Sequence, residues 1–278
     1  MPSRKITLSL GAASLIATVF SLPMLLQAQD HEEAPTAQSL MERLENDYVA
    51  FAARVDGPVD LEMLELGRRI AVGGGETEGA QAGCVSCHGA RGQGKAGQEG
   101  DGSEAVPRLA GQAGWYSYKQ LSNYASGSRS NEVMSGIASK LTEIEMKAVS
   151  AYYAVIEAPY PDLASDVDQD VLQRGEQIAT IGSSELGIPS CTNCHGPQGT
   201  GLPPSVPYLM GQYPGYMTHQ LELWRDGVRD NDVMNIMSTI ATKMSDEDMR
   251  AISEYYARVR PQSSQADRVA PNAPDLSE

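Results

Sequence analysis

Basic residues are in short supply in this sequence. The chain of 278 residues contains 21 lysines and arginines against 36 aspartates and glutamates, which gives a formal net charge of −15. A surface this acidic argues against nucleic acid and against anionic lipid as partners, because both carry negative charge. It permits electrostatic attraction towards a basic patch on a partner protein, although a requirement for solubility alone also explains it.

Long apolar runs are missing beyond the beginning of the chain. Residues 6–26 form such a run behind Arg4 and Lys5, and Ala28 offers a small residue for cleavage. This pattern predicts a secretory signal peptide over residues 1–28. The run is long for a signal peptide, so an uncleaved membrane anchor is the alternative. No later stretch is apolar enough to be expected to span a bilayer.

Cysteine and histidine are also scarce, with four of each. All four cysteines and two of the histidines fall in two runs, Cys84-Val85-Ser86-Cys87-His88 and Cys191-Thr192-Asn193-Cys194-His195. Each run has the form C-x-x-C-H, which is the attachment motif of a c-type haem. In this motif the cysteines form thioethers to the porphyrin and the histidine is an axial ligand of the iron. The sequence therefore predicts two covalently bound haem c groups.

Three other interpretations of the cysteines are weaker. A thioredoxin-like C-x-x-C is expected near a βαβ pattern, and strand patterns are nearly absent from this sequence. A zinc site does not require a histidine after each cysteine pair. Structural disulfides suit a secreted chain, but a disulfide that spans only two intervening residues is strained. The haem interpretation accounts for both histidines as well as all four cysteines.

The chain repeats itself. The matching segments are residues 66–71 and 174–179, the two C-x-x-C-H runs, 107–112 and 207–212, 127–129 and 227–229, 137–141 and 240–244, and the tyrosine pairs at 152–153 and 255–256. A repeat of this kind indicates a tandem duplication of one structural unit. It predicts two similar domains, which we place at residues 59–157 (the first repeat) and 158–260 (the second repeat).

Helical spacing of apolar residues predicts an all-α fold for both repeats. The positions that form apolar faces in the first repeat are Leu61, Leu64, Ile70 and Ala71, and then Ile144, Ala148, Val149 and Tyr152. Thr142 and Glu145 form a capping box, and Ser245 with Asp248 occupies the equivalent place in the second repeat. Residues 157–169 are rich in proline and aspartate and are predicted to be the linker. Residues 261–278 are predicted to be a disordered tail.

Residues 29–58 lie outside the repeat and are acidic. Apolar side chains recur in this segment at helical spacing, at Leu40, Leu44, Tyr48, Phe51, Ala52 and Val55. The pattern predicts an amphipathic helix that packs on the first repeat. A helix that docks onto a partner protein is the alternative.

The second axial ligand separates an electron carrier from an enzyme, because an iron with an open site can bind a substrate. No cysteine is left, and most of the twelve methionines are expected to fill the core. Met134 lies four residues before Ala138, and the same offset from Ala241 selects Met237. A count from the upstream arginines selects Met234 instead, because the second repeat has three extra residues there. We prefer the downstream count, and predict Met134 and Met237 as ligands beside His88 and His195.

Taken together, these features resemble the class I c-type cytochromes, and specifically the dihaem cytochrome c4 family. The resemblance covers about residues 60–260, and it rests on the doubled C-x-x-C-H-G, the P-x-L-x-G-Q-x-x-x-Y-x-x-x-Q-L segment and the methionine before A-x-K-L/M. It implies two tandem class I cytochrome c domains with haem propionates near their interface. It also implies that Gly67 and Gly175 let the first helix of each repeat cross the last one, against Tyr153 and Tyr256.

The same resemblance implies further roles around each haem. The carbonyls of Pro107 and Pro207 would accept the Nδ1 protons of His88 and His195, which orients the iron ligands. The residues implied to lie near the propionates are Tyr116, Tyr216, Arg129 and Arg229. For the tyrosines, plain core packing is the alternative.

The predicted function is that of a periplasmic single-electron carrier, because covalent haem attachment in bacteria occurs outside the cytoplasmic membrane. It would carry electrons from a quinol-oxidising complex or a dehydrogenase to a terminal oxidase. Its partners would be redox proteins, with membrane contact only through them or through an uncleaved signal anchor. One alternative is a cytochrome subunit bound permanently to a dehydrogenase. A dihaem redox enzyme, such as a peroxidase or a thiosulfate-oxidising cytochrome, is disfavoured by the matched methionines and the lack of a spare cysteine.

Overall fold

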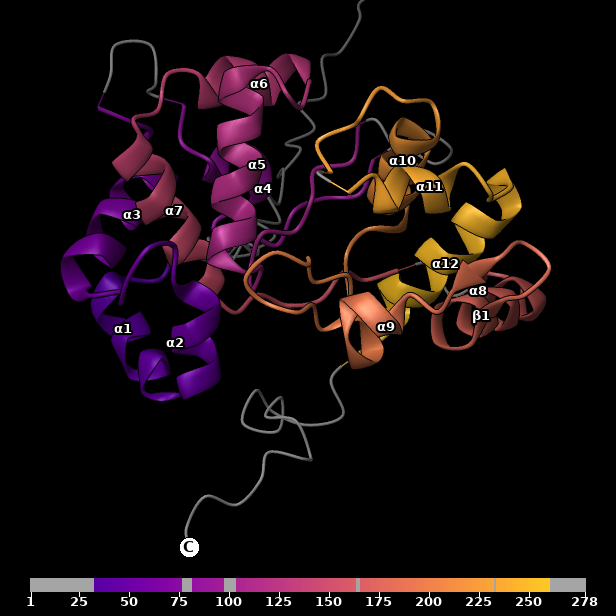
Figure 1. The fold of residues 1–278 in the computed structure, drawn as a ribbon. Coiled ribbons are helices and arrows are strands. Elements are labelled where there is room, and N and C mark those ends of the chain that lie inside the picture. The colour runs from indigo at the N-terminus through magenta and orange to yellow at the C-terminus, as the bar shows by residue number, and fades with distance from the viewer. Residues whose placement is uncertain (1–32, 77–81, 98–103, 164–165, 233, 261–278) are drawn as a thin grey trace, which may run out of the picture. The chain divides into compact units, whose positions relative to one another are not determined.

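Helices dominate the computed structural model, which describes residues 33–76, 82–97, 104–163, 166–232 and 234–260 (Figure 1). In chain order the elements are α1 (Ala37–Met41), the 3-10 helix η1 (Glu42–Glu45), α2 (Asp47–Ala53), α3 (Leu61–Gly73), α4 (Val85–His88), α5 (Gly114–Ser126), α6 (Glu132–Ala138), α7 (Glu143–Val155), α8 (Gln169–Thr180), β1 (Gly182–Ser183), β2 (Ile188–Pro189), α9 (Thr192–His195), the 3-10 helix η3 (Pro197–Gly199), α10 (Pro214–Arg225), α11 (Ile236–Ala241) and α12 (Asp246–Arg258).

The all-α prediction is confirmed, since the named strands in these ranges are only the two-residue pair β1 and β2. Within the described ranges, no helix combines the length and the apolar character needed to cross a membrane. The predicted signal peptide and the predicted C-terminal tail lie outside the described residues.

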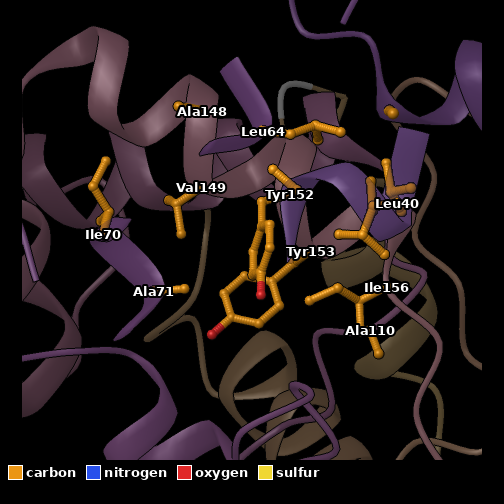
Figure 2. Packing of buried hydrophobic residues seen from close by; sticks show 14 of the residues in the cluster. Leu40, Leu64, Ile70, Ala71, Ala110, Ala148, Val149, Tyr152, Tyr153 and Ile156 are labelled. Carbon is orange, nitrogen blue, oxygen red and sulfur yellow. The ribbon is translucent and has the colours of Figure 1, made fainter. Parts of the chain in front are cut away.

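Each repeat has its own hydrophobic core around its last helix. In the first repeat α7 packs against α3 and α5, and in the second repeat α12 packs against α8 and α10. Figure 2 shows Tyr152 and Tyr153 together in the first core, close to Leu64, Val149 and Ile156. Full burial of a side chain such as Leu64 contributes about 1.5–3 kcal/mol. The duplication seen in the sequence is thus also a duplication of the core.

A glycine sits where the first and last helices of each repeat cross. A Cβ atom added at Gly67 would overlap the carbonyl oxygen of Ala148 and approach Tyr152. At Gly175 it would overlap the carbonyl oxygen of Ala251. The close crossing is therefore as expected. The prediction that Tyr153 and Tyr256 contact these glycines is wrong.

The first tyrosine of each pair, Tyr152 or Tyr255, faces the glycine. It lies four residues after the alanine at the crossing, on the same face of its helix. The second, Tyr153 or Tyr256, projects instead over a glycine that follows the haem motif of its own repeat. The two tyrosines of a pair therefore serve two different contacts.

We expect Gly175→Ala to destabilise the second repeat by about 2 kcal/mol, because backbone at the crossing cannot yield as a flexible side chain would. This cost outweighs the gain of up to about 1 kcal/mol that alanine normally brings to a helix. The matched control is Gly73→Ala in α3, where an added Cβ meets nothing within 4 Å. Thermal unfolding of both variants measures the difference. A Gly175→Ala protein as stable as the control would contradict the close crossing.

Side-chain caps fix where the last helices begin. Thr142 and Glu145 form the predicted capping box at the start of α7. At α12 the Ser245 hydroxyl accepts from the Asp248 N–H, but the shorter Asp248 side chain pairs with Arg174 of α8 at 2.8 Å. The second repeat therefore uses the acid at this position to hold its first and last helices together.

The acidic extension packs on the first repeat. Leu40 and Val49 belong to the same buried cluster as Leu64 and Tyr152, and the Tyr152 hydroxyl donates to the Pro35 carbonyl at 2.9 Å. The predicted single helix is divided into α1, η1 and α2. The division occurs at Asn46, whose side chain caps α2 by accepting from two backbone N–H groups.

Three apolar positions predicted to face the core are exposed instead. They are Phe51 in α2, Leu61 at the first position of α3 and Ile144 in the first turn of α7. Leu61 and Ile144 lie on the outer side of first turns whose later residues, Leu64 and Met146, are buried. Periodicity gives the face of a helix but does not say how much of its length is covered.

The linker between the repeats is held by arginines from both sides. Arg108 of the first repeat donates to the carbonyls of Ala158 and Pro159, and Arg260 donates to the carbonyl of Pro161. Both guanidinium groups lie over the ring of Tyr160, at 4.8 and 4.7 Å from its centroid. These contacts are typical cation–π geometry and fix the described part of the linker against both repeats.

Candidate functional site

Each C-x-x-C-H run folds into one helical turn, α4 in the first repeat and α9 in the second. Cys84 and Cys191 are the N-cap residues of these turns. The backbone carbonyl of each accepts from the backbone N–H of the histidine in the same run at 2.8 Å. Residues three apart in a helix lie on the same face. The two thiols of each run are therefore on one side of the turn, next to the histidine.

Burial makes the first thiol of each run harder to ionise. The first cysteine of each run is half-buried and the second is exposed, and none of the four forms a disulfide. Burial raises the pKa of the Cys84 and Cys191 thiols to about 11. Zinc and redox dithiol sites need deprotonated sulfur. In the described part of the chain, no three Cys, His, Asp or Glu side chains are grouped as a metal site requires.

Both motif histidines are buried and held in one orientation. The Nδ1 atoms of His88 and His195 lie 2.9 Å from the carbonyl oxygens of Pro107 and Pro207. Because a carbonyl only accepts, Nδ1 carries the proton and Nε2 keeps its lone pair. Burial lowers the pKa of each imidazole, although the bond to the proline carbonyl acts in the opposite direction. The geometry presents two neutral imidazoles that can each donate Nε2 to an iron.

Met134 and Met237 occupy equivalent places in two short helices. At the ends of α6 and α11 the N–H groups of Ser139 and Thr242 donate to the carbonyls of Ser135 and Ser238. Each methionine directly precedes one of these accepting serines. In both helices an upstream side chain accepts the methionine's own N–H. Asn131, the N-cap of α6, does so at 2.9 Å, and Asp232, which lies before α11, does so at 2.6 Å.

Met234 lies outside α11 and its residue is 75% exposed, whereas Met237 is half-buried against the second core. The extra residues of the second repeat are accommodated before the helix, where Asn235 adopts a left-handed conformation with φ of 53°. This conformation is uncommon for a residue with a side chain, and asparagine tolerates it best. The geometry favours Met237, whose role as an iron ligand remains a proposal.

Two buried arginines lie at the contact between the repeats. Arg129 donates to the Tyr216 hydroxyl at 3.1 Å, and Arg229 donates to the Tyr116 hydroxyl at 3.3 Å. Neither guanidinium pairs with a carboxylate in the residues that the structure describes. Burial opposes ionisation of Tyr116, but the charges of Arg229 and Arg129 outweigh it and lower the pKa of this hydroxyl. The two arginines and two tyrosines that were predicted to lie near the propionates are thus brought together in one cluster. The arginines give this cluster a positive charge.

The family model described as Cytochrome c matches this chain twice, over residues 75–154 and 173–259. The chain belongs to the cytochrome c family. Each match contains one C-x-x-C-H turn and one of the two methionine helices. This cytochrome therefore has two c-type domains, as the repeat predicted.

Curated relatives refine the assignment. The cytochrome is 42% identical over 195 residues to a thiosulfate dehydrogenase electron acceptor of Stutzerimonas stutzeri (strain A1501), covering 69% of this chain and 86% of the relative. It is 34% identical to a cytochrome c4 of Pseudomonas aeruginosa, covering 62% of this chain and 81% of the relative. The predicted resemblance to dihaem cytochrome c4 is confirmed.

Solved structures agree. A crystal structure of reduced cytochrome c4 from Pseudomonas stutzeri matches with a TM-score of 0.59 and 29% identity, over 71% of this chain and 98% of that one. The thiosulfate dehydrogenase TsdBA from Marichromatium purpuratum matches with a TM-score of 0.64 and 33% identity, over 73% of this chain. This cytochrome spans only 41% of the TsdBA chain.

The residues present fit two haem c groups, and the prediction of this cofactor is confirmed by the family. In each repeat, two thiols and one oriented imidazole lie on one turn, with a thioether side chain on the later helix α6 or α11. Buried, uncompensated guanidinium groups are costly. The carboxylates of haem propionates would supply the missing negative charge beside Arg129 and Arg229.

Sequence reasoning missed the glutamines of this site. In the sequence, Gln112 and Gln212 end the repeated segments 107–112 and 207–212. Gln120 and Gln220 belong to the repeated P-x-L-x-G-Q-x-x-x-Y-x-x-x-Q-L segment. The structure buries Gln112, Gln212 and Gln120 and makes each glutamine bond a residue of the other repeat. Their recurrence in both repeats was the available signal. Their partners are far away in sequence and follow only from the arrangement of the repeats.

Proposed function

We propose that this cytochrome is a periplasmic single-electron carrier that accepts electrons from a thiosulfate dehydrogenase and passes them to a terminal oxidase. The observation that carries the proposal is that each repeat contains one oriented histidine and, on a later short helix, one methionine whose N–H is bound by a side chain. The relative named as an acceptor for thiosulfate dehydrogenase supports this donor. The likeness to part of TsdBA supports it independently.

When bound, haem c supplies a one-electron couple at each site. The proposed axial ligands are His88 with Met134, and His195 with Met237. Thioether sulfur favours reduced iron and raises the reduction potential relative to two histidines. With a histidine and a methionine bound to each iron, peroxide, oxygen and thiosulfate would have no open position to occupy. Electrons could then enter and leave without a change in the protein ligands.

The alternative of a permanently bound subunit is favoured by one observation, the TsdBA match, in which the matching region is part of a larger chain named as the enzyme. The acidic extension offers no separate support for it. Its buried apolar residues pack on the first repeat, so they are not available to a partner. Gel filtration of this cytochrome mixed with the dehydrogenase distinguishes a stable complex from a diffusing carrier.

Reduction by the proposed donor is the direct test. The oxidised full chain is mixed with purified thiosulfate dehydrogenase and thiosulfate, and the absorption of reduced haem is followed by stopped flow. We expect both haems to be reduced within the turnover time of the enzyme, and no reduction when the dehydrogenase is omitted. Thiosulfate turnover by this cytochrome alone would make it an enzyme. If the complete mixture leaves it oxidised, the proposed donor is wrong.

The negative charge of the protein predicts how small reductants will react with it. A cationic reductant such as hexaammineruthenium(II) is attracted to the acidic surface, so its rate should fall as salt rises beyond about 0.1 M, where the Debye length is roughly 10 Å. An anionic reductant such as ferrocyanide should show the opposite dependence. Stopped-flow rates over a series of salt concentrations measure both.

A paired variant locates the charge. Asp226 and Asp230 are exposed and flank Arg229, and the first repeat has Ser126 and Ser130 in their places. Asp226→Ser with Asp230→Ser should flatten the salt dependence for the cationic reductant at the second haem. If the reduction rates of the unmodified protein do not change with ionic strength, its acidic surface does not attract the cationic reductant.

A further inference from the structure

The peptide group that joins Pro107 to Arg108 is used twice. Its carbonyl accepts from His88 Nδ1 at 2.9 Å. Its N–H, on Arg108, donates to the side-chain oxygen of Gln212 at 2.8 Å. The acceptor belongs to the second repeat, whereas the histidine belongs to the first. One peptide group therefore links the proximal histidine of one haem to a glutamine of the other domain.

The second repeat has the reciprocal arrangement. The Pro207 carbonyl accepts from His195 Nδ1 at 2.9 Å, and the N–H of the same peptide group, on Tyr208, donates to Gln112 Oε1 at 3.0 Å. Residue 108 is an arginine and residue 208 a tyrosine, yet the pattern is the same, because it uses only backbone and glutamine atoms. The duplication thus provides two independent copies of the link.

Each glutamine is held so that its oxygen stays on the peptide N–H. Gln212 Nε2 donates to the Arg108 carbonyl at 3.0 Å, and Gln112 Nε2 donates to the Tyr208 carbonyl at 3.1 Å. The side-chain amide therefore bonds both backbone groups of one residue across the domain contact. Both glutamines are more than nine-tenths buried, so water cannot readily replace them. Loss of either side chain would leave buried backbone groups unpaired.

Hydrogen bonds in a chain polarise one another. When the N–H of a peptide group donates, its carbonyl oxygen becomes more negative and is a better acceptor. A stronger bond from Nδ1–H then increases the basicity of the imidazole as an iron ligand. A more basic ligand favours ferric iron and lowers the reduction potential.

We propose that Gln112 tunes the haem held by His195 and that Gln212 tunes the haem held by His88, each acting as a positioning residue across the contact between the domains. The reduction potential of each haem then depends on whether the other domain is docked against its own. This inference concerns the relation between the two haems and does not depend on the identity of the electron donor.

The test uses the full chain with Gln112→Leu and, separately, Gln212→Leu. Spectroelectrochemistry gives the two reduction potentials, which are assigned to the haems by Met134→His and Met237→His backgrounds. Gln112→Leu should raise the potential of the His195 haem and leave the His88 haem unchanged, and Gln212→Leu should do the reverse. In the reduced protein, the Nδ1 proton of the affected histidine should move upfield in the NMR spectrum, as a weaker hydrogen bond requires.

The crossed pattern separates tuning from general loosening. Tyr160→Phe is a neutral control that removes a hydroxyl bond to Tyr208 and leaves its peptide group untouched, so it should move neither potential. A shift of both potentials together, a shift at the haem of the glutamine's own domain, or an equal shift in the control overturns the proposal. If the leucine variants do not fold, amide exchange in the unmodified protein decides. Arg108 and Tyr208 N–H groups that exchange as fast as exposed amides would refute the link.

Discussion

Replacing Met237 with histidine should lower the reduction potential of one haem by on the order of 0.2 V, a fraction of the range of about 0.8 V that axial ligands span in haem proteins. The other haem should remain nearly unchanged. The reason is that thioether sulfur favours ferrous iron, whereas a second imidazole favours ferric iron. Met134→His should have the same effect on the other haem. Potentiometric titration followed by absorption spectroscopy resolves the two transitions.

Met234→His is the matched control, because Met234 is exposed and lies before α11 begins. It should leave both potentials and the weak far-red sulfur-to-iron band of the oxidised protein in place. Met237→His should remove about half of that band. If Met234→His lowers a potential and Met237→His does not, the alignment of the two repeats across the three extra residues is wrong.

Replacing Cys191 and Cys194 together with serine should reduce the covalent haem content from two per chain to one. Both cysteines supply sulfur from a single helical turn, and the rest of the described chain has no further cysteine outside the first motif. The second core should also become less stable, since a bound haem completes it. A pyridine haemochrome assay on denatured protein gives the haem content, and haem staining after gel electrophoresis confirms covalent attachment.

Thr192→Ala is the control for this variant, because it changes the same turn between the two cysteines and keeps both thiols. It should retain two haems per chain. If the double serine variant still carries two covalent haems, the second C-x-x-C-H run is not an attachment site. If acid acetone extracts the haem from the unmodified protein, neither C-x-x-C-H run is a covalent attachment site.

Much of the haem site could be predicted because its chemistry is local in sequence. A C-x-x-C-H run places its three functional side chains on one turn, whatever surrounds it. The repeat supplied the methionine register: Ala138 and Ala241 end equivalent helices, so the offsets from them survive into the structure. An upstream count failed to agree because the extra residues are accommodated ahead of α11, where no helix maintains the spacing.

The extension shows where periodicity alone is insufficient. Six apolar positions suggested one helix, but Asn46 followed by Asp47 is a helix-start signal in the middle of the segment. The structure uses this signal and begins α2 there. In the divided segment the Phe51 residue is 47% exposed, while Val55 is buried. Attention to caps as well as to spacing would have divided the helix.

The contacts between the domains could not be predicted from the sequence. Gln112 and Tyr208 are 96 residues apart, and so are brought together only by the way in which two separately folded cores dock. The sequence contains the repeated glutamine but no indication of its partner. The reciprocal arginine and tyrosine contacts have the same origin. Duplication indicates that such contacts can be reciprocal, but not which residues make them.

Our central proposal is that protein side chains occupy both axial positions of both irons, so that this cytochrome would carry electrons without binding substrates at iron. The most direct measurement is the absorption spectrum of the fully reduced full chain before and after addition of carbon monoxide, which binds ferrous haem only where a position is open. We expect an unchanged low-spin spectrum for both haems. Formation of a carbon monoxide complex at either haem, under conditions where the protein stays folded, would contradict it.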